Sequence, residues 1–216
     1  NCISCHKEAK NIETNVHAKV KCYDCHTKHD IKPAKEFAKE QTKNCLSCHK
    51  KQNIQHYSES VHAKNNVTCE SCHGGGHVVK KIAKNEVSAT CGKCHGEHQK
   101  NFNNSIHMQV MNKGNQNAPT CTDCHGSHKI IRGKISVESQ ACLECHLDEK
   151  KFPGEEKGSA KFVQHYKTSI HASVEKDGLL EAAGCVDCHG NHMIQEPNNP
   201  KASTNRARLM ETCGKC

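Results

Sequence analysis

The stretch Cys121-Thr-Asp-Cys-His125-Gly-Ser-His128 contains the pattern that decides the fold of this chain. Two cysteines stand three positions apart, a histidine follows the second cysteine directly, and another histidine comes three residues later. The cysteine spacing recurs along the whole sequence, so we treat it as the unit of organisation. All 18 cysteines fall into C-x-x-C pairs, which are Cys2 and Cys5, Cys22 and Cys25, Cys45 and Cys48, Cys69 and Cys72, Cys91 and Cys94, Cys121 and Cys124, Cys142 and Cys145, Cys185 and Cys188, and Cys213 and Cys216.

A histidine follows each pair that has a next residue in the sequence. C-x-x-C-H is the attachment signature of haem c. Two thiols add across the two vinyl groups of one porphyrin, and the adjacent histidine reaches the iron from one face. We expect eight haems on the complete motifs and a ninth at Cys213 and Cys216, with a histidine encoded after Cys216. The eight proximal ligands predicted in this way are His6, His26, His49, His73, His95, His125, His146 and His189.

Other uses of paired cysteines fit this pattern poorly. A disulfide framework gives no reason for a histidine after every pair. Zinc ribbons use paired cysteines, but they do not require histidine directly after the second thiol. Thioredoxin-like redox pairs occur once in each βαβ unit rather than along a whole chain.

The composition indicates that the polypeptide cannot form a large core by itself. Hydrophobic residues make up 34% of the 216 residues, aromatic residues 3%, and tryptophan is absent. A chain of this length normally buries many more large side chains. We therefore predict a mostly irregular fold with short α-helices and little or no β-structure, in which the polypeptide wraps around a stack of haems.

The net charge of +8 has an explanation that does not involve nucleic acid. The sequence has no arginine cluster, no aromatic platform and no basic stripe on one element, which are the usual cues for nucleic-acid binding. Each haem carries two propionates, and lysine side chains can pair with these carboxylates. We expect no nucleic-acid partner.

A two-haem repeat organises the chain. Each repeat has one C-x-x-C-H motif, then an [SN]-[IV]-H segment, then a second C-x-x-C-H motif followed by another histidine three or four residues later. We predict a single multihaem domain built from repeats at about 1–44, 45–90, 91–141 and 142–212, with a fifth starting at 213. We predict a surface loop at the insertion 147–160 and a short helix over 178–183.

The repeat supplies one further histidine for each complete motif. Two histidines on one iron leave no free position for substrate, so such an iron passes single electrons. The second histidine of each second motif is tethered close to the proximal one, so we expect it to serve a neighbouring haem. These distal candidates are His17, His29, His62, His77, His107, His128, His171 and His192.

Three histidines lie outside this scheme, namely His56, His98 and His165. The first and last stand in matching Gln-His-Tyr sequences, and His98 follows its proximal histidine by three residues. One of them could serve the ninth haem. Binding to propionates and plain solvation are the alternatives that the sequence leaves open.

The chain resembles the multihaem c-type cytochromes of bacterial and archaeal anaerobic respiration that have paired C-x-x-C-H motifs. The stretches Ser105–His107, Cys121–His128 and Pro197–Cys216 carry the resemblance, which extends along the whole chain. It implies export before haem attachment, and hence a periplasmic, cell-surface or extracellular location. The chain itself opens at Asn1 without a signal peptide, which predicts a processed form.

Three functions follow as alternatives. We favour an electron carrier that is not an enzyme and that works with other redox proteins, with self-assembly into a wire or oligomer as a further expectation. The second alternative is the haem-bearing head of a membrane quinol-oxidising complex. The third is an octahaem enzyme acting on nitrite, hydroxylamine or tetrathionate. An enzyme needs an open iron position, whereas all readable motifs keep histidine and distal candidates are in surplus.

Overall fold

The fold was analysed in a computed structural model, which describes residues 2–27, 29–50, 52–130, 136–148, 150–151, 157–176 and 183–215. These residues form short helices joined by irregular segments, and none of them lies in a β-strand. The predicted fold class is therefore confirmed. The 3₁₀-helices are η1 (Cys2–Ser4), η2 (Lys7–Thr14), η3 (Gln52–Glu59), η4 (Lys84–Glu86) and η5 (Arg206–Arg208).

The α-helices are short because most of them contain little more than a haem motif or the segment that follows an [SN]-[IV]-H serine. Among the described residues, no helix is long and apolar enough to cross a membrane. The α-helices are α1 (Cys22–His26), α2 (Ala34–Cys48), α3 (Val61–Lys64), α4 (Cys69–His73), α5 (Val87–Gly92), α6 (Gly96–Asn103), α7 (Ile106–Asn112), α8 (Cys121–His125), α9 (Ser136–His146), α10 (Lys157–Lys167), α11 (Ile170–Lys176), α12 (Cys185–His189) and α13 (Leu209–Cys213).

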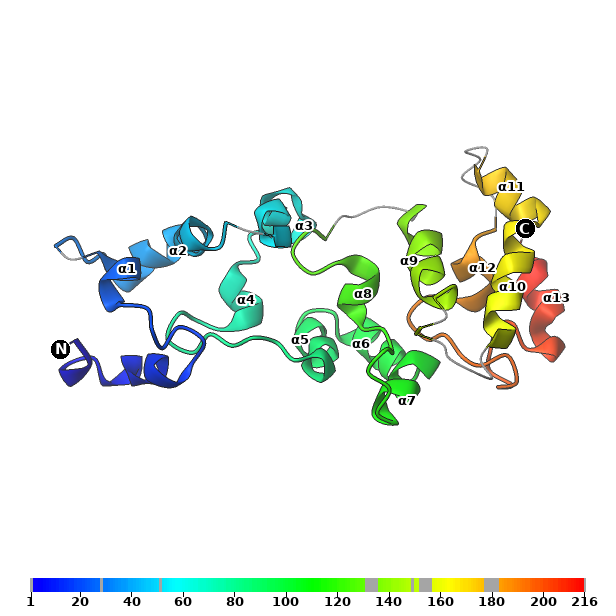
Figure 1. Cartoon of the computed structure of the whole chain (residues 1–216), viewed down its shortest axis with the longest axis horizontal. Helices are drawn as coiled ribbons and strands as arrows, with labels where there is room; N and C mark the ends of the chain where they lie inside the picture. The colour runs from blue at the N-terminus through cyan, green and yellow to red at the C-terminus, as the bar shows by residue number, and fades with distance from the viewer. Residues whose placement is uncertain are drawn as a thin grey trace. The chain divides into compact units, whose positions relative to one another are not determined.

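The chain divides into two compact parts. The first part comprises Asn1–Glu86 with His125–Arg132, and the second comprises Val87–Cys124 with Gly133–Cys216. In the first part, η1 packs on η2 and α3 packs on η3, and α3 precedes α4 along the chain (Figure 1). In the second part, α5 packs on α6 and α6 on α7, while α9 packs on α10 and α12.

Protein side chains form almost no core in the described residues. The buried hydrophobic residues are Val87, Phe102, Ala118 and Ala202. Two of these four are alanines, which bury little apolar area. The stabilisation that a soluble domain usually draws from its core must come from elsewhere, as expected for a chain that packs on a cofactor.

Two local predictions can be compared with the structure. Helix α10 begins at Lys157, so the last residues of the predicted surface loop at 147–160 are helical and that part of the prediction is wrong. The remainder of the insertion between Lys151 and Lys157 lies outside the described residues. The helix predicted over 178–183 also falls almost entirely outside them, and so does Cys216.

Candidate functional site: histidine pairs between repeats

The second motif of every repeat is a separate five-residue helix. Helices α1, α4, α8 and α12 each begin at the first cysteine of the motif and end at its proximal histidine. The cysteines stand at i and i+3, as Cys69 and Cys72 do in α4, which places both thiols on one face of the helix. One porphyrin can therefore bind both sulfur atoms while the next residue, histidine, lies beside it.

A side chain inside the motif caps each of these helices. The backbone N–H before the first cysteine donates a hydrogen bond to the third motif residue, over 3.0 Å to Asp24, 3.2 Å to Ser71, 2.6 Å to Asp123 and 2.8 Å to Asp187. A capping interaction of this kind is worth about 1 kcal/mol. The second variable position of C-x-x-C is thus occupied by residues that start the helix.

The residue after the proximal histidine ends each helix with a positive φ angle. Glycine occupies this position in three repeats, with φ of 84° at Gly74, 75° at Gly126 and 72° at Gly190. The first repeat has Thr27 there, with φ of 61°. A side chain is strained in this conformation. The sharp turn leads the chain away from its own haem motif towards the second histidine.

The first motif of a repeat is placed differently. In α2 and α9 the motif forms the C-terminal end of a longer helix, which for α9 includes Cys145. In the first and third repeats the second cysteine lies in a turn just after a helix. The backbone N–H of Cys5 donates there to the Cys2 carbonyl over 3.1 Å, and that of Cys94 donates to the Cys91 carbonyl over 3.2 Å. These turns keep the i, i+3 relation of the two thiols without a cap.

The cysteines of the predicted attachment sites differ in exposure. Cys5 and Cys94 are exposed, whereas Cys72 and Cys145 are partly buried. A thioether forms when the sulfur atom of such a cysteine adds to a haem vinyl group. Attachment of haem at these four cysteines therefore stays a prediction.

Neighbouring groups contact some of these thiols. Lys151 Nζ donates to Cys145 Sγ over 3.6 Å, which places a positive charge beside the seventh motif. The other predicted attachment cysteines within the described residues are likewise exposed or partly buried, and these are Cys2, Cys22, Cys25, Cys45, Cys48, Cys69, Cys91, Cys121, Cys124, Cys142, Cys185, Cys188 and Cys213.

A buried serine positions the [SN]-[IV]-H histidines. Ser60 and Ser105 are fully buried and accept hydrogen bonds from the backbone N–H groups of Ala63, at 3.1 Å, and Met108, at 3.3 Å. The serine caps a helix whose second residue is the distal histidine candidate. Its φ and ψ angles are extended, so the chain turns sharply into that helix.

An aromatic residue three positions before the serine was missed by the sequence reasoning. It is Tyr57, Phe102 or Tyr166 in the second, third and fourth repeats. The Tyr57 hydroxyl donates to the Val67 carbonyl, and the Tyr166 hydroxyl donates to the Ala183 carbonyl over 3.1 Å. Both carbonyls lie two residues before a second motif. The aromatic spacing is visible in the sequence and could have revealed this anchor.

Four predicted distal histidines lie beside predicted proximal ones. The ring centres are 6.0 Å apart for His17 and His49, 5.7 Å for His26 and His77, 6.1 Å for His73 and His128, and 6.3 Å for His107 and His146. Two imidazoles on opposite sides of one metal ion, at roughly 2 Å from metal to nitrogen, have ring centres about 6 Å apart. The spacing of the four pairs therefore fits an iron ion between the rings.

The members of each pair come from neighbouring repeats. A first-motif histidine faces the [SN]-[IV]-H histidine of the preceding repeat, as in His49 with His17 and His146 with His107. A second-motif histidine faces the second histidine of the following repeat, as in His26 with His77. The first-motif register is the same in both compact parts. The third repeat therefore contributes a ligand position to the repeat on either side, the first contributes one to the second, and the second contributes one to the first.

Burial and the facing ring lower the pKa of three of these imidazoles and so favour their neutral form. Desolvation, followed by the charge of His146, lowers the pKa of His107 to about 4. Desolvation is also the main cause that lowers the pKa of His26 and of His128, with His77 and His73 as the second causes. Only the neutral imidazole has a lone pair to bind a metal. These sites are therefore ready to bind metal near neutral pH.

Comparison with known protein families agrees with this geometry. Residues 61–146 match the family model of cytochrome c3. Residues 14–54 match the model of the doubled CXXCH motif. The two matches together cover both motif types, the [SN]-[IV]-H segment and the paired histidines of several repeats. No curated protein matches the chain.

This chain is a multihaem c-type cytochrome. The family likeness indicates that it binds haem c and transfers electrons. Within the described residues, no group of three or more His, Cys, Asp or Glu side chains has the geometry of a metal site.

Attachment points of successive haems lie side by side in the cytochrome. A hydrogen bond joins the Cys45 thiol to that of Cys69, raising the pKa of Cys45 and lowering that of Cys69 to about 6. Cys91 and Cys121 are joined in the same way, with the pKa of Cys121 lowered to about 7. Each bond connects the first and second motifs of one repeat. The two predicted attachment points are therefore neighbours in the second and third repeats.

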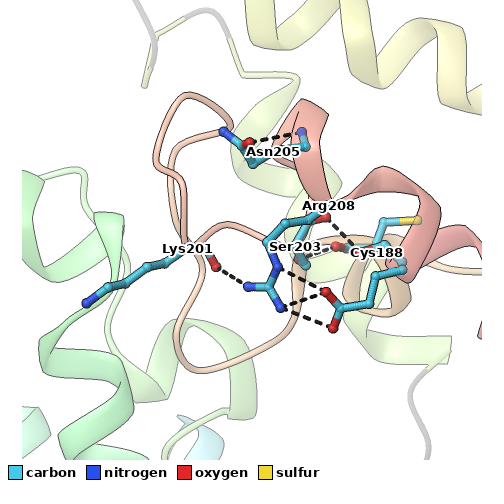
Figure 2. A network of polar contacts seen from close by, with 8 residues as sticks. Cys188, Lys201, Ser203, Asn205 and Arg208 are labelled. Atoms are coloured by element: carbon cyan, nitrogen blue, oxygen red, sulfur yellow. Dashed lines mark hydrogen bonds and ion pairs between the residues drawn. The ribbon is translucent and has the colours of Figure 1, made fainter.

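The chain after the eighth motif folds back and connects it to the ninth (Figure 2). The Ser203 hydroxyl donates to the Cys188 carbonyl, and the Thr212 hydroxyl donates to the Ser203 carbonyl over 2.7 Å. Arg208 fixes the loop by donating to the Lys201 carbonyl over 2.9 Å and by pairing with the next acidic residue of α13 at 3.1 Å. Because Thr212 precedes the ninth motif, the last two motifs are neighbours, and α12 packs on α13.

The remaining predicted ligands lie elsewhere. The ring of His192 is 4.5 Å from that of His98, which is in turn 6.1 Å from His95. His62 belongs to the first compact part. In the described part of the chain, His29 and His171 have no ring contact with a proximal histidine.

Of the histidines outside the scheme, His56 has a clear structural role. Its Nδ1 lies 2.9 Å from Glu59 Oε1, and Lys129 Nζ lies 2.8 Å from Glu59 Oε2. Hydrogen bonds from His56 and then Lys129 lower the pKa of Glu59 to about 2. His165 is exposed on α10. His98 therefore remains the one of the three that stands next to predicted ligands in the described residues.

Proposed function

We propose that the cytochrome conducts electrons along a series of haems whose irons are each bound by two histidines, without catalysing a reaction of its own. The observation that carries the proposal is the set of four histidine pairs with ring centres 5.7–6.3 Å apart. An iron with two imidazole ligands has no open position for a substrate. Nitrite, hydroxylamine or tetrathionate chemistry would require such a position.

The proposed ligand sets cross between repeats. Each set joins a proximal histidine to a distal one from the repeat before or after it. Each iron therefore connects two repeats. The same ligands that complete the iron sites also cross-link neighbouring repeats of the polypeptide. The four sets are His17 with His49 on the haem of Cys45 and Cys48, His107 with His146 on the haem of Cys142 and Cys145, His77 with His26 on the haem of Cys22 and Cys25, and His128 with His73 on the haem of Cys69 and Cys72.

Neighbouring attachment points support conduction between haems. Cys45 lies beside Cys69 and Cys91 lies beside Cys121, so the two motifs of each of these repeats are neighbours, and Ser203 connects the eighth motif to the ninth. Haems carry the electrons, while the protein sets their spacing, ligands and solvent exposure. Electron transfer along a series of adjacent haems requires no conformational change of the protein.

The physiological setting follows from the resemblance to anaerobic respiratory cytochromes. We propose that the protein is exported and works in the periplasm, at the cell surface or outside the cell, exchanging electrons with other redox proteins. We propose eight haems on the complete motifs and a ninth on Cys213 and Cys216. The lysine excess offsets the propionate charges that these haems bring.

Electron paramagnetic resonance of the ferric holoprotein tests the ligand sets. We expect low-spin signals for the four haems assigned above, unchanged by added cyanide or nitrite. His77→Ala should convert one haem to high spin and allow cyanide to bind it. The matched control His165→Ala, at an exposed histidine on a helix, should leave the spectrum unchanged.

The proposal that the cytochrome only conducts electrons, which we call the conduit proposal, makes a second and independent prediction. A potentiometric titration should take up as many electrons as there are haems, and steady turnover of nitrite, hydroxylamine or tetrathionate should be absent. Rapid turnover of one of these compounds by the wild-type protein, with a large cyanide-sensitive high-spin fraction, would contradict the proposal.

A further inference from the structure

A backbone hydrogen bond connects successive repeats at equivalent positions in two places. The N–H of Val61 donates to the carbonyl of Ile130 over 2.8 Å, and the N–H of Ile106 donates to the carbonyl of Ile194 over 2.8 Å. The donor directly precedes the [SN]-[IV]-H histidine of one repeat. The acceptor is the second residue after the second histidine of the next repeat. We call this contact the repeat joint.

Side chains reinforce both repeat joints. In the first joint, the carboxylate of Glu59 pairs with the ammonium group of Lys129, the residue before Ile130, over 2.8 Å. In the second joint, the side-chain amide of Gln195 donates to the carbonyl of Asn104 over 2.6 Å. The four residues of the two backbone bonds are apolar and at least partly buried. Each joint therefore combines a backbone bond with covered apolar residues and a polar contact.

The second joint lies beside two of the predicted distal histidines. His107 directly follows the donor Ile106, and His192 stands two residues before the acceptor Ile194. His107 comes from the third repeat, and its ring lies 6.3 Å from that of the fourth repeat's proximal His146. His192 comes from the fourth repeat. The joint thus contains one distal candidate from each of the two repeats that it connects.

The first joint is placed in the same way. His62 directly follows the donor Val61, and His128 stands two residues before the acceptor Ile130. His128 belongs to the third repeat, and its ring lies 6.1 Å from that of the proximal His73 in the second repeat. In both joints, therefore, one of the two distal candidates faces a proximal histidine of the other repeat.

The first two repeats show both exchanged ligands with their partners. The first repeat's His17 faces the second repeat's His49 at 6.0 Å, and the second repeat's His77 faces the first repeat's His26 at 5.7 Å. The exchange between these neighbouring repeats is therefore reciprocal. One exchanged histidine directly follows the donor position of a joint, and the other precedes the acceptor position by two residues.

The residues at the joint positions of the first two repeats lie together as well. Val16, the residue before His17, occupies the donor position, and Val79, two residues after His77, occupies the acceptor position. Both line one cleft together with Asn15. Where both exchanged histidines face their partners, the two halves of the joint are therefore neighbours.

We propose that each repeat joint positions both ligands that two repeats exchange, so that two haems depend on one backbone hydrogen bond. Through the second joint, the third repeat supplies His107 to a haem of the fourth, and the fourth supplies His192 to a haem of the third. Val61 and Ile106 are positioning residues that act through their backbone N–H groups. The inference rests on the proposed bis-histidine function and adds the contact that holds the ligands in place.

The histidines follow the joint because their tethers are short. His107 is the next residue after Ile106, and a single residue separates His192 from Ile194. Consecutive Cα atoms are about 3.8 Å apart, so neither histidine can move far while the joint holds. The cap of Ser105 fixes His107 within α7 but does not tie α7 to the fourth repeat. The joint supplies that connection for both ligands at once.

A proline at the donor position breaks the joint with little effect on the helix that follows. Ile106→Pro removes the N–H and places a ring carbon against the Ile194 carbonyl. Ile106 is the first residue of α7, where helices accept proline because the N–H has no partner within the helix. Ser105 has φ of −78° and ψ of 161°, the extended backbone that a residue before proline requires. Val61→Pro is the same change in the first joint, since Ser60 has φ of −70° and ψ of 155°.

Cyanide titration of the ferric, haem-loaded full chain counts the haems that lose a ligand. Ile106→Pro should open two haems beyond the wild-type count, and so should Val61→Pro. His107→Ala should open one, because it removes a single ligand and leaves the joint intact. The double variant His107→Ala, His192→Ala should open two haems and give the same high-spin spectrum as Ile106→Pro. Adding His107→Ala to Ile106→Pro should open no third haem.

Two matched controls separate the N–H from the side chain and from proline itself. Ile106→Ala removes most of the side chain but keeps the N–H, and it should open no haem. Ala34→Pro places proline at the exposed first residue of α2, after Pro33 with ψ of 150° and outside both joints, and it should also open none. Haem content and circular dichroism check that each variant is folded. Gln195→Ala removes only the polar contact of the second joint, and cyanide should bind the same two haems faster than in the wild type.

The results that overturn this proposal differ from those that overturn the ligand assignment. If Ile106→Pro opens one haem or none while His107→Ala opens one, the ligands are correct but the joint does not position them together. Opening of two haems by Ile106→Ala or Ala34→Pro would also remove the proposal, because the hydrogen bond would not be the cause. If His107→Ala opens no haem, the bis-histidine ligation of the conduit proposal itself fails.

Discussion

The first repeat and the later repeats place their histidines with different local devices. The third repeat has a buried serine cap at Ser105, an aromatic anchor at Phe102 and glycine at the positive-φ position 126. The first repeat has Asn15 and Thr27 at the first and last of these positions. Yet the first repeat's [SN]-[IV]-H histidine faces its proximal partner at 6.0 Å, much as the third repeat's does at 6.3 Å. The serine cap, the aromatic anchor and the glycine thus only adjust the positions of the histidines, whose pairing depends mainly on the iron ligands themselves.

The largest effect on folding should come from withholding haem, because both the first repeat and the later repeats pack on this cofactor. Burial of a porphyrin takes far more apolar area out of water than the few buried side chains do. Protein produced without haem attachment should be unfolded in all repeats, because cofactor binding and folding are linked. Circular dichroism should show no cooperative thermal transition. A cooperatively folded apoprotein would contradict this expectation and show that local devices suffice.

Removing a distal histidine should open one haem in either region, with a larger loss of stability in the third repeat. Desolvation lowers the pKa of His107, which indicates a buried ring, so His107→Ala also leaves a cavity, which costs roughly 2–4 kcal/mol. His17→Ala should open a haem at a smaller cost. Cyanide titration counts the opened haems, and denaturant unfolding ranks the two variants. Equal destabilisation by His107→Ala and His17→Ala would contradict the proposed difference between the third and the first repeat.

The serine cap gives a test in which the two repeats should respond in opposite directions. Ser105→Ala removes a buried cap and should cost about 1–2 kcal/mol of unfolding free energy. In the first repeat, Asn15 has a buried side-chain nitrogen without a hydrogen-bond partner. Asn15→Ser removes that orphan donor and should stabilise the protein by about 1 kcal/mol. Urea unfolding of both variants measures the difference, and destabilisation by Asn15→Ser would show that the first repeat is already optimal.

Two substitutions at the positive-φ position should have smaller effects on stability, again in opposite directions in the two repeats. Thr27→Gly should relieve backbone strain and stabilise the first repeat by about 1 kcal/mol, offset in part by the lost 2.7 Å hydrogen bond from its hydroxyl to Asp30. Gly126→Ala introduces the strain into the third repeat and brings a Cβ to 3.1 Å from the Lys129 carbonyl. Thermal unfolding should move up for the first variant and down for the second. A rise for Gly126→Ala would count against the geometric argument.

The smallest effect should be a pH dependence of stability that comes from Glu59, whose carboxylate pairs with Lys129 of the next repeat. Its pKa is lowered from the usual 4.5 to about 2, so its stabilising effect is complete above pH 4.5 and is lost as the pH falls towards 2. Glu59→Gln should lower stability slightly at pH 7 and flatten the loss of stability between pH 4.5 and pH 2, and both effects should be small because the pair is exposed. An unaltered acid profile would show that this ion pair adds nothing to the contact between the repeats.

The sequence alone predicted the cofactor, the strand-free fold and the histidine inventory. Eight C-x-x-C-H motifs specify haem c through covalent chemistry, and the scarcity of large apolar residues excludes a protein core. The motif helices also have a local origin, because residues such as Asp123 cap them from within. The spacing did not distinguish motifs that lie inside a helix, such as the one ending at Cys72, from those that close in a turn, as at Cys5 and Cys94.

Partner assignments could not be derived from the sequence. The short tether between His125 and His128 indicates only that the second histidine serves another haem. Its contact with His73 depends on how distant segments fold back. The aromatic anchor at Tyr57 and Tyr166 had a visible spacing, but its meaning required the carbonyls that these hydroxyls reach.

The central claim is that iron ligands cross from one repeat to the next. The most direct measurement is a high-resolution structure of the haem-loaded protein, examined at the iron of the haem on Cys142 and Cys145. The predicted result is His146 on one side of that iron and His107, from the preceding repeat, on the other. A sixth ligand from the fourth repeat itself, such as His165 or His171, would contradict the account.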